Sequence, residues 1–390
     1  SRRQRQMCIR DRARTRSISP VFGIMEQQSG AGGWNCRMMM PMPKPGQMRL
    51  WSLQAIAHGA DFVSYFRWRT ATVGTEIYWH GLHDYDNREN RRVRELIQTA
   101  ETVKKISPYV TGQLFRAPIA ILIDYDNEWD GENDIWHGPL REKSMDGLFC
   151  ALQKTHIPYD LVNLREDVTP EDLARYQVAF YPHSTIFTKR QKEVLEKAVE
   201  MGLTLLFGCR SGYKDETGRC YTMPMPGYVG ELTGCQVEEY TYVSHFDTEV
   251  CIAWQDKQAG AREFHDVLEV TDGQVEAVFS GRGCHYDGKP AIVSKKTGKG
   301  CAYYVGTIFT EELARMIVET MELTKLSPAY GEIKLPETVE LCRRGDVTFL
   351  LNYEETPARI CLNERRIDLL TGEEVQGEAE IPARDVKILK

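Results

Sequence analysis

The sequence predicts an α/β protein made of two parallel α/β regions followed by a small β domain. Three observations support this fold class. Short apolar runs alternate with helical patterns over residues 20–112 and again over 117–207, which is typical of strand–helix units in parallel sheets. The run over 117–124 is apolar on both faces, as expected for a central parallel strand. Short alternating strands over 331–390 predict a small antiparallel β domain.

Length and composition are those of an ordinary folded protein. The 390 residues are 42% hydrophobic and 27% charged, which favours two or three domains and excludes a mainly disordered or coiled-coil chain. No run of eighteen apolar residues occurs, so we expect no membrane partner. The net charge of −7 argues against a nucleic-acid partner. The 11 cysteines are scattered without zinc-binding spacing, so we expect no metal site and reduced thiols in a cytoplasm.

Residues 1–19 differ in composition from the rest of the chain. They hold seven arginines and a single acidic residue, Asp11, and show almost no apolar periodicity. An export signal is excluded because no apolar segment follows Arg2 and Arg3. An organelle transit peptide remains open. We expect this stretch to be non-native, out-of-frame sequence or disordered, which implies that the natural chain began further upstream.

Residues 20–112 are expected to form two strand–helix units. A buried apolar strand ends at Glu26 and leads into a loop rich in Gly, Pro and Met. The helical pattern that follows ends before Gly59, a residue type that commonly terminates helices. A second strand and a long helix with a basic face complete the region. The expected elements cover residues 21–25, 46–58, 62–66 and 87–106.

Residues 113–330 are expected to form a doubly wound parallel sheet. Thr169 and Pro170 predict the start of a short helix, because Thr is a favourable N-cap and Pro suits the first turn. Beyond Gly212 the pattern loosens into strands before a last strand and helix. The expected elements, with two strands of the C-terminal domain, cover 117–124, 140–154, 159–164, 178–181, 189–201, 203–207, 302–310, 311–323, 347–352 and 358–362.

Polar and aromatic residues gather at the ends of the first two expected strands. Glu26 ends the first strand, where α/β barrels keep their active sites, although a solvent-facing or helix-capping glutamate fits equally. Trp34 lies in the loop after it, and Glu76 and His80 follow the second strand. An indole beside carboxylates, Arg and His suits a sugar, whose apolar face packs on the ring. A core role for Trp34, and a surface-helix pair of Glu76 with His80, remain open.

Several motifs make the chain resemble the glycoside hydrolase family 42 β-galactosidases. The similar stretches are residues 22–34, 45–51, 55–61, 66–69, 74–81, 125–129 and 210–215. The resemblance implies that Glu26, in a Met-Glu-Gln motif, is the catalytic nucleophile and that Trp34, Glu76 and His80 bind galactose. It further implies a homotrimer that uses no cofactor.

The resemblance also implies a domain order. Residues 20–112 would be the last two strand–helix units of a catalytic TIM (β/α)8 barrel, 113–330 a flavodoxin-like trimerisation domain, and 331–390 a C-terminal β domain. The implied reaction is retaining hydrolysis of terminal non-reducing β-D-galactosides by double displacement, which needs two carboxyl groups. The family's general acid/base, a Glu preceded by Asn, has no counterpart before Glu26, and neither has the family's cysteine zinc cluster. We therefore expect the isolated chain to be inactive; the alternative is a non-catalytic assembly or carbohydrate-binding fragment.

Other functions receive little support from the sequence. Cys209 follows an apolar run, but Phe207 and Ser211 occupy the positions where a nucleophile elbow has glycine. No phosphate-binding glycine motif follows the run over 119–124, which argues against a nucleotide-binding module. Residues 124–127 resemble a metal loop only loosely, because they lack the spacing and the glycine of an EF-hand, and we expect them to be structural.

Overall fold

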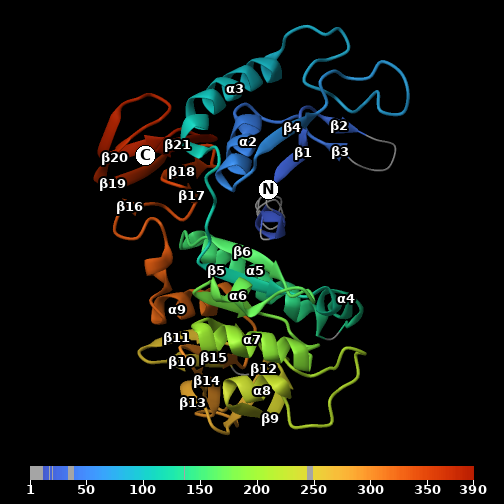
Figure 1. Cartoon of the computed structure of the whole chain (residues 1–390), viewed down its shortest axis with the longest axis vertical. Helices are drawn as coiled ribbons and strands as arrows, with labels where there is room; N and C mark the ends of the chain where they lie inside the picture. The colour runs from blue at the N-terminus through green and yellow to red at the C-terminus, as the bar shows by residue number, and fades with distance from the viewer. Residues whose placement is uncertain (1–11, 17, 20, 34–38, 136, 244–248) are drawn as a thin grey trace. The chain divides into compact units, whose positions relative to one another are not determined.

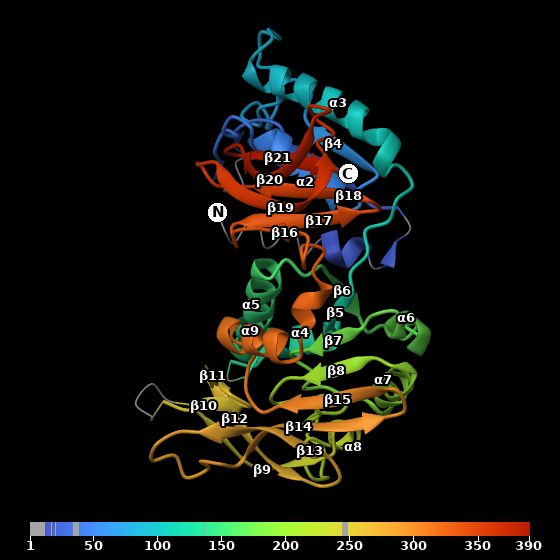
Figure 2. The same cartoon turned by 90° about the vertical axis from the view of Figure 1, so that its left-hand side faces the viewer.

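The chain divides into two compact units. The computed structural model describes every residue except 1–11, 17, 20, 34–38, 136 and 244–248. One unit joins Arg3–Arg116 to Ser327–Lys390, and the other is Ala117–Leu326 (Figures 1 and 2). Within the described residues, no helix is both long enough and apolar enough to cross a membrane.

The N-terminal part of the first unit contains two parallel strands with a helix between them. β1 (Gly23–Gln28) pairs with β4 (Phe62–Phe66), and α2 (Gln47–Ala57) makes the crossover. A short ribbon of β2 (Gly32–Gly33) and β3 (Met39–Met40) follows β1. This arrangement is the strand–helix–strand unit that the sequence predicts. The first strand covers 23–28 instead of the predicted 21–25, and it ends later because the pairing with β4 continues past Glu26. The prediction that this strand is buried is wrong, because Val21 and Met25 are exposed.

The long helix of this part is α3 (Arg91–Val110). The sequence predicts its start at residue 87, which is wrong, because Asn90 is the N-cap. The Asn90 side chain accepts hydrogen bonds from the backbone N–H groups of Arg92 and Val93. Asn87 has a φ of 59°, which lies outside the right-handed helical region. The helix therefore begins four residues later and extends to Val110.

The C-terminal β domain shares a core with α2 and α3. One of its two three-stranded antiparallel sheets packs Phe349 and Ile388 against Leu50, Leu53 and Ile106 of the helices. Segments far apart in the sequence therefore form one unit. The first sheet contains β17 (Val339–Arg344), β18 (Val347–Asn352) and β21 (Asp385–Leu389), and the second contains β16 (Ile333–Lys334), β19 (Ala358–Ile367) and β20 (Glu374–Ile381).

The second unit is built on a flavodoxin-like sheet, as predicted. Its parallel strands have the order β6-β5-β7-β8-β15, which corresponds to the 2-1-3-4-5 order of that fold. These strands are β5 (Ile119–Ile123), β6 (Tyr159–Asn163), β7 (Val178–Tyr181), β8 (Thr204–Phe207) and β15 (Gly300–Val305). Antiparallel strands extend the same sheet: β14 (Pro290–Thr297), β13 (Gln274–Ser280), β10 (Cys251–Trp254) and β11 (Lys257–Gly260). A separate ribbon pairs β9 (Cys235–Tyr242) with β12 (Phe264–Val270).

The helices of this unit begin largely where their capping residues predict. Thr169 caps α6 in a capping box with Asp172, and Thr188 does the same for α7 with Gln191. The strand predicted at 302–310 ends earlier, at Val305. The sequence missed two helices, α4 and α8; α4 was missed because its residues are mostly polar and acidic, and α8 is only six residues long. The helices are α4 (Tyr125–Asn133), α5 (Gly138–Lys154), α6 (Pro170–Ala174), α7 (Lys189–Met201), α8 (Tyr228–Thr233) and α9 (Glu311–Thr320).

Part of the arginine-rich segment is described. Residues 12–16 are helical, and residues 1–11 lie outside the described residues. Arg12 Nη1 donates to the Gln54 side chain at 2.5 Å, and Arg16 Nη1 donates to the His58 carbonyl at 2.9 Å. The Arg16 guanidinium also lies 3.8 Å from the centre of the Phe115 ring. That residues 1–19 are foreign to the natural chain stays a prediction.

Candidate functional site

Two parallel strands end at the same edge and carry the candidate residues. The pairing of β1 with β4 ends with Gln28 opposite Phe66. Its register shifts between Ile24 and Gln27, and Glu26 lies within this irregularity with its side chain exposed. A bulge of this kind re-aims side chains next to active sites. The carboxylate of Glu26 is therefore accessible near the carboxyl end of β1.

Glu76 is held by an arginine that follows β4. Arg67 Nη1 donates to Glu76 Oε2 at 2.8 Å, and both side chains are partly exposed. The Arg67 guanidinium also lies 5.0 Å from the centre of the Phe66 ring. The residues around Glu76 form turns and no helix, so a surface-helix pair of Glu76 with His80 is excluded. The ion pair leaves one carboxylate oxygen of Glu76 available to another donor.

His80 is fixed through its backbone and its ring. Its N–H donates to the Ala31 carbonyl at 2.8 Å, in the loop after β1. Its Nδ1 lies 3.8 Å from Asp84 Oδ1, and its ring meets the edge of the Tyr85 ring at a centroid distance of 5.7 Å. A Cβ at Gly30 would lie 2.5 Å from the His80 carbonyl oxygen, so this approach requires glycine. The loops after β1 and β4 are thus joined where Glu76 and His80 lie.

A buried serine connects the two strand ends. Ser29 follows β1, and its hydroxyl donates to the Phe66 carbonyl at 2.6 Å. Gly33 N–H donates to the Tyr78 carbonyl at 3.1 Å, which extends the same connection. Because these bonds join the two loops, the candidate residues of one strand end are positioned relative to those of the other. The structure therefore brings the loops bearing Glu76 and His80 to the edge where Glu26 lies.

Exposed aromatic rings surround this edge. Trp68 and Tyr78 are 64% and 63% exposed, although large rings usually bury most of their surface. Trp68 lies 4.8 Å, centre to centre, from the His83 ring. The fourth candidate, Trp34, lies outside the described residues. Arg67 and Trp68 belong to a motif that is visible in the sequence, but no role for either residue is predicted from it; their position directly after a strand is the available signal.

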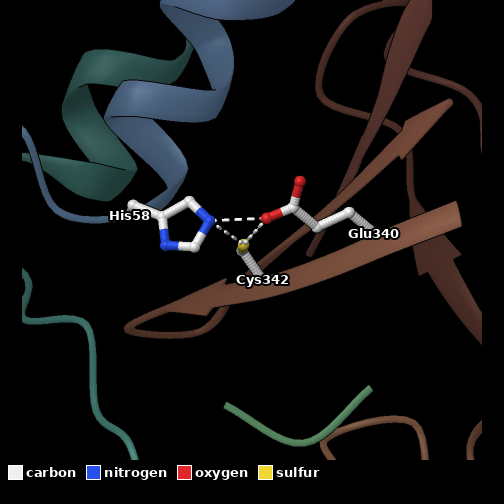
Figure 3. Close-up of side chains that lie close together, drawn as sticks. All are labelled: His58, Glu340 and Cys342. Atoms are coloured by element: carbon white, nitrogen blue, oxygen red, sulfur yellow. Dashed lines mark hydrogen bonds and ion pairs between the residues drawn. The ribbon is translucent and has the colours of Figure 1, made fainter. Parts of the chain in front are cut away.

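One side-chain cluster in the first unit has ligand types that zinc prefers. His58, Glu340 and Cys342 are buried, and one potential ligand atom from each lies within 4.8 Å of the others (Figure 3). His58 follows α2, while Glu340 and Cys342 point to the same face of β17 because they are two residues apart. By residue type and distance, the cluster could therefore hold a metal ion.

Hydrogen bonds account for this cluster without a metal. Arg16 Nη1 lies 3.3 Å from His58 Nδ1, so Nδ1 is the acceptor and Nε2 carries the proton. His58 Nε2 then donates to Glu340 Oε1 at 2.6 Å, and Tyr353 and Gln54 donate to Oε2 at 2.5 and 2.9 Å. Burial raises the pKa of the Cys342 thiol well above its usual value, which disfavours the thiolate that binds metals. We assign it as a structural network.

The pKa values of the pair agree with this assignment. Burial, the largest cause, lowers the pKa of His58. Burial alone would raise the pKa of Glu340, but the hydrogen bond and the charge of His58, with hydrogen bonds from Tyr353 and Gln54, outweigh it and lower the pKa to about 2. The pair is therefore an imidazole that donates through Nε2 to a carboxylate.

Among the described residues of the second unit, neither Cys209 nor the segment 124–127 supports a rival function. Cys209 is buried, and burial raises the pKa of its thiol well above the usual value, the opposite of an activated nucleophile. Asp124 Oδ1 accepts from the Asp126 N–H at 2.8 Å and caps α4. Asn127 is buried and exchanges two hydrogen bonds with the backbone of Ile186. Asp124 and Asn127 therefore have structural roles, in line with the prediction for residues 124–127.

Family comparisons match three consecutive stretches of the chain. Residues 2–106 match the family described as "Beta-galactosidase". Residues 117–325 match the "Beta-galactosidase trimerisation domain", and residues 338–390 the "Beta-galactosidase C-terminal domain". The second of these matches covers more than half of the chain.

Individual relatives and solved structures carry the same description. Beta-galactosidase LacZ of Heyndrickxia coagulans is 29% identical over 96% of this chain and 56% of its own length. Beta-galactosidase BgaA of Clostridium cellulovorans is 32% identical over 82% of this chain and 47% of its own. The GH42 beta-galactosidase Gan42B has a TM-score of 0.86 at 25% identity, covering 98% of this chain and 56% of that one. A beta-galactosidase from Bacillus circulans sp. alkalophilus has a TM-score of 0.84 at 24% identity, with coverage of 98% and 57%. The chain spans about half the length of the relatives it matches.

Proposed function

Because the chain belongs to the glycoside hydrolase family 42 β-galactosidases, we propose that it forms part of a retaining β-galactosidase that acts on terminal non-reducing β-D-galactosides. One observation carries the proposal. An exposed glutamate, Glu26, lies near the carboxyl end of β1, and the loop after the parallel strand β4 carries Glu76 and His80. Active sites of α/β barrels lie at this edge.

In the proposed reaction, Glu26 is the nucleophile. Its carboxylate attacks C1 of the galactoside, the glycosidic C1–O bond breaks, and a covalent galactosyl-enzyme forms. Water then attacks C1, releases galactose and returns Glu26 as a carboxylate. A second carboxyl group about 5–5.5 Å from the first must protonate the leaving oxygen and later activate the water. We assign that acid/base role to no residue of this chain.

The sugar would be held by the loops after the two strands. Glu76 has one oxygen bonded to Arg67, so its other oxygen can accept from a sugar hydroxyl. His80 can exchange a hydrogen bond with a second hydroxyl. Trp34 is proposed to cover the apolar face of the ring. The exposed rings of Trp68 and Tyr78 support a carbohydrate site, because sugars pack on aromatic faces.

The other expected properties are proposals of the same kind. We propose a homotrimer formed through residues 113–330, in line with the matched trimerisation domain. We propose three domains. Residues 20–112 would be the last two strand–helix units of a TIM barrel, residues 113–330 the trimerisation domain and residues 331–390 the C-terminal β domain. A cytoplasmic location fits the free buried thiols of Cys209, Cys235 and Cys342. Nucleic-acid and membrane partners are not expected from the net charge and the hydropathy.

A mechanism-based label tests the assignment of the nucleophile. A chimera would carry residues 21–390 in place of the matching part of the Clostridium cellulovorans relative. Treatment with 2,4-dinitrophenyl 2-deoxy-2-fluoro-β-galactoside should trap the galactosyl-enzyme, because the fluorine slows both steps while the dinitrophenolate leaving group keeps formation fast. Peptide mass spectrometry should find the label on Glu26, and free galactose should protect against it. A label on another carboxylate would overturn the assignment.

A further inference from the structure

An exposed apolar patch lies at the carboxyl edge of the parallel sheet in the second unit. It consists of Tyr125 and Trp129 on α4 and Ile135 just beyond that helix. Tyr125 is 43% exposed, Trp129 is 58% exposed and Ile135 is 95% exposed. The two rings are four residues apart on one helix face, with centroids 5.7 Å from each other. We call these three residues the α4 patch; α4 directly follows β5 (Figure 1).

The opposite side of α4 is anchored firmly in the unit. The Asn127 side chain is buried, donates to the Ile186 carbonyl at 2.9 Å and accepts from the Ile186 N–H at 2.8 Å. Asp124 caps the first turn. The exposed rings therefore project from a rigid support, and little conformational entropy would be lost when they are covered.

The unit neutralises two of the acidic side chains beside the patch. Glu128 forms an ion pair with Arg141, and Asp130 accepts from Lys214 Nζ at 2.9 Å. Both acids are only partly exposed, as are their cations. A partner surface therefore need not supply positive charge at these two positions. The three residues of the patch are themselves aromatic and aliphatic, the composition that dominates the centres of protein–protein interfaces. Asp126 and Glu132 on the same helix are exposed as well, so a partner surface would meet these two acidic residues at the border of the patch.

We propose that the α4 patch is a contact with a second copy of this chain. The proposal deepens the homotrimer proposed above and rests on it. The patch belongs to residues 117–325, whose family description is a trimerisation domain, and that description identifies the occupant as another copy. In a closed ring of three, each contact joins two different surfaces, so the α4 patch would meet another surface of the next copy. Trp129, the largest exposed side chain of the patch, would be the energetic centre.

Sedimentation of the full 390-residue chain tests this proposal. Trp129→Ala should raise the dissociation constant of the trimer at least tenfold, because interface tryptophans carry a large share of the binding energy. Met201→Ala is the matched control, since Met201 is 46% exposed on α7 of the same unit, and should leave assembly unchanged. Ile135→Asp should weaken the trimer as well. Circular dichroism would verify that each variant keeps the wild-type fold.

The possible failures are distinguishable. A wild-type trimer that Trp129→Ala and Ile135→Asp leave intact would overturn the α4 patch as a contact and leave the trimer standing. A wild-type chain that stays monomeric at tens of micromolar would overturn the homotrimer and the patch with it. Hydrogen exchange of α4 supplies a second readout: we expect protection to rise on assembly. Equal protection in the dilute monomer and the trimer would mean that the chain covers the patch itself, which also overturns the proposal.

Discussion

Arg67 Nη1 donates to Glu76 Oε2 at 2.8 Å, at the carboxyl end of β4. Partly exposed ion pairs of this kind stabilise a fold by about 0–1 kcal/mol. We therefore expect this pair to matter mainly by positioning Glu76. The proposed substrate site therefore depends on Arg67, although Arg67 makes no proposed contact with the reacting atoms.

Removing the arginine should affect binding more than stability. In the chimera described above, Arg67→Ala should raise KM for aryl β-galactosides several-fold and change the free energy of unfolding by less than about 1 kcal/mol. Arg94→Ala is the control, because Arg94 forms an exposed pair with Glu89 at 3.4 Å. Equal KM values for the Arg67 and Arg94 variants would contradict a positioning role for Arg67.

Replacing the proposed nucleophile should abolish turnover. Glu26→Gln in the chimera should lower kcat for an aryl β-galactoside by more than about a thousandfold, because an amide is a far poorer nucleophile than a carboxylate. Azide should restore part of the rate and yield the galactosyl azide of inverted configuration. A Gln variant with near-normal activity would remove Glu26 from the reaction.

The 390-residue chain by itself should hydrolyse no β-galactoside. Double displacement needs two carboxyl groups, and we assign only the nucleophile here. The measurement is a fluorogenic β-galactoside assay on purified chain, with the chimera as the positive control. If the chain alone were active and Glu26→Gln abolished that activity, the chain would contain the acid/base residue as well as the nucleophile.

Breaking the buried pair of His58 and Glu340 should destabilise the first unit. Glu340→Ala would leave the donors of His58, Tyr353 and Gln54 without their acceptor, at a cost of about 3–5 kcal/mol in the free energy of unfolding. Glu380→Ala, in an exposed pair with Arg359 on β20, is the control and should cost under about 1 kcal/mol. Urea unfolding followed by tyrosine and tryptophan fluorescence would measure both.

The same cluster predicts how the protein responds to metal. Because hydrogen bonds occupy the ligand atoms of His58 and Glu340 and burial raises the pKa of the Cys342 thiol, neither added zinc nor EDTA should shift the melting temperature by more than about a degree. A stabilisation by zinc that Cys342→Ala removes would reverse the structural assignment.

A buried histidine should make the second unit sensitive to acid. Burial, followed by the charge of Arg141, lowers the pKa of His183 to about 3 from 6.5. The unfolded chain binds a proton below about pH 6.5 while the folded chain does not, so stability is complete above that pH and falls as pH drops towards 3. Between pH 6 and 4.5 the loss should be about 2 kcal/mol, measured by hydrogen exchange of β7 and β8 amides. His183→Gln should remove this part of the pH dependence, whereas His285→Gln, at an exposed site, should leave it.

The local elements of the fold follow from the sequence alone. β7, β18 and α7 have the predicted bounds, because apolar runs and capping residues such as Thr188 act over a few neighbouring positions. The parallel strands of the second unit are buried on both faces, and continuous apolar runs identify such strands. The candidate residues after β1 and β4 could be found in the same way, since parallel strands place their ends at one edge.

Other features were decided by tertiary structure. The start of α3 depends on Asn90, whose capping bonds a periodicity search does not detect. α4 has few apolar residues and is held by Asn127, which bonds to Ile186 across the fold. His58 and Glu340 lie 282 positions apart, and no local pattern brings them together. Their meeting depends on α2 packing against the C-terminal β domain, so the buried polar network is specified only when that shared core forms. Sequence patterns predict helices and strands because these depend on neighbouring residues. Hydrogen bonds between residues far apart in the sequence form only in the packed structure.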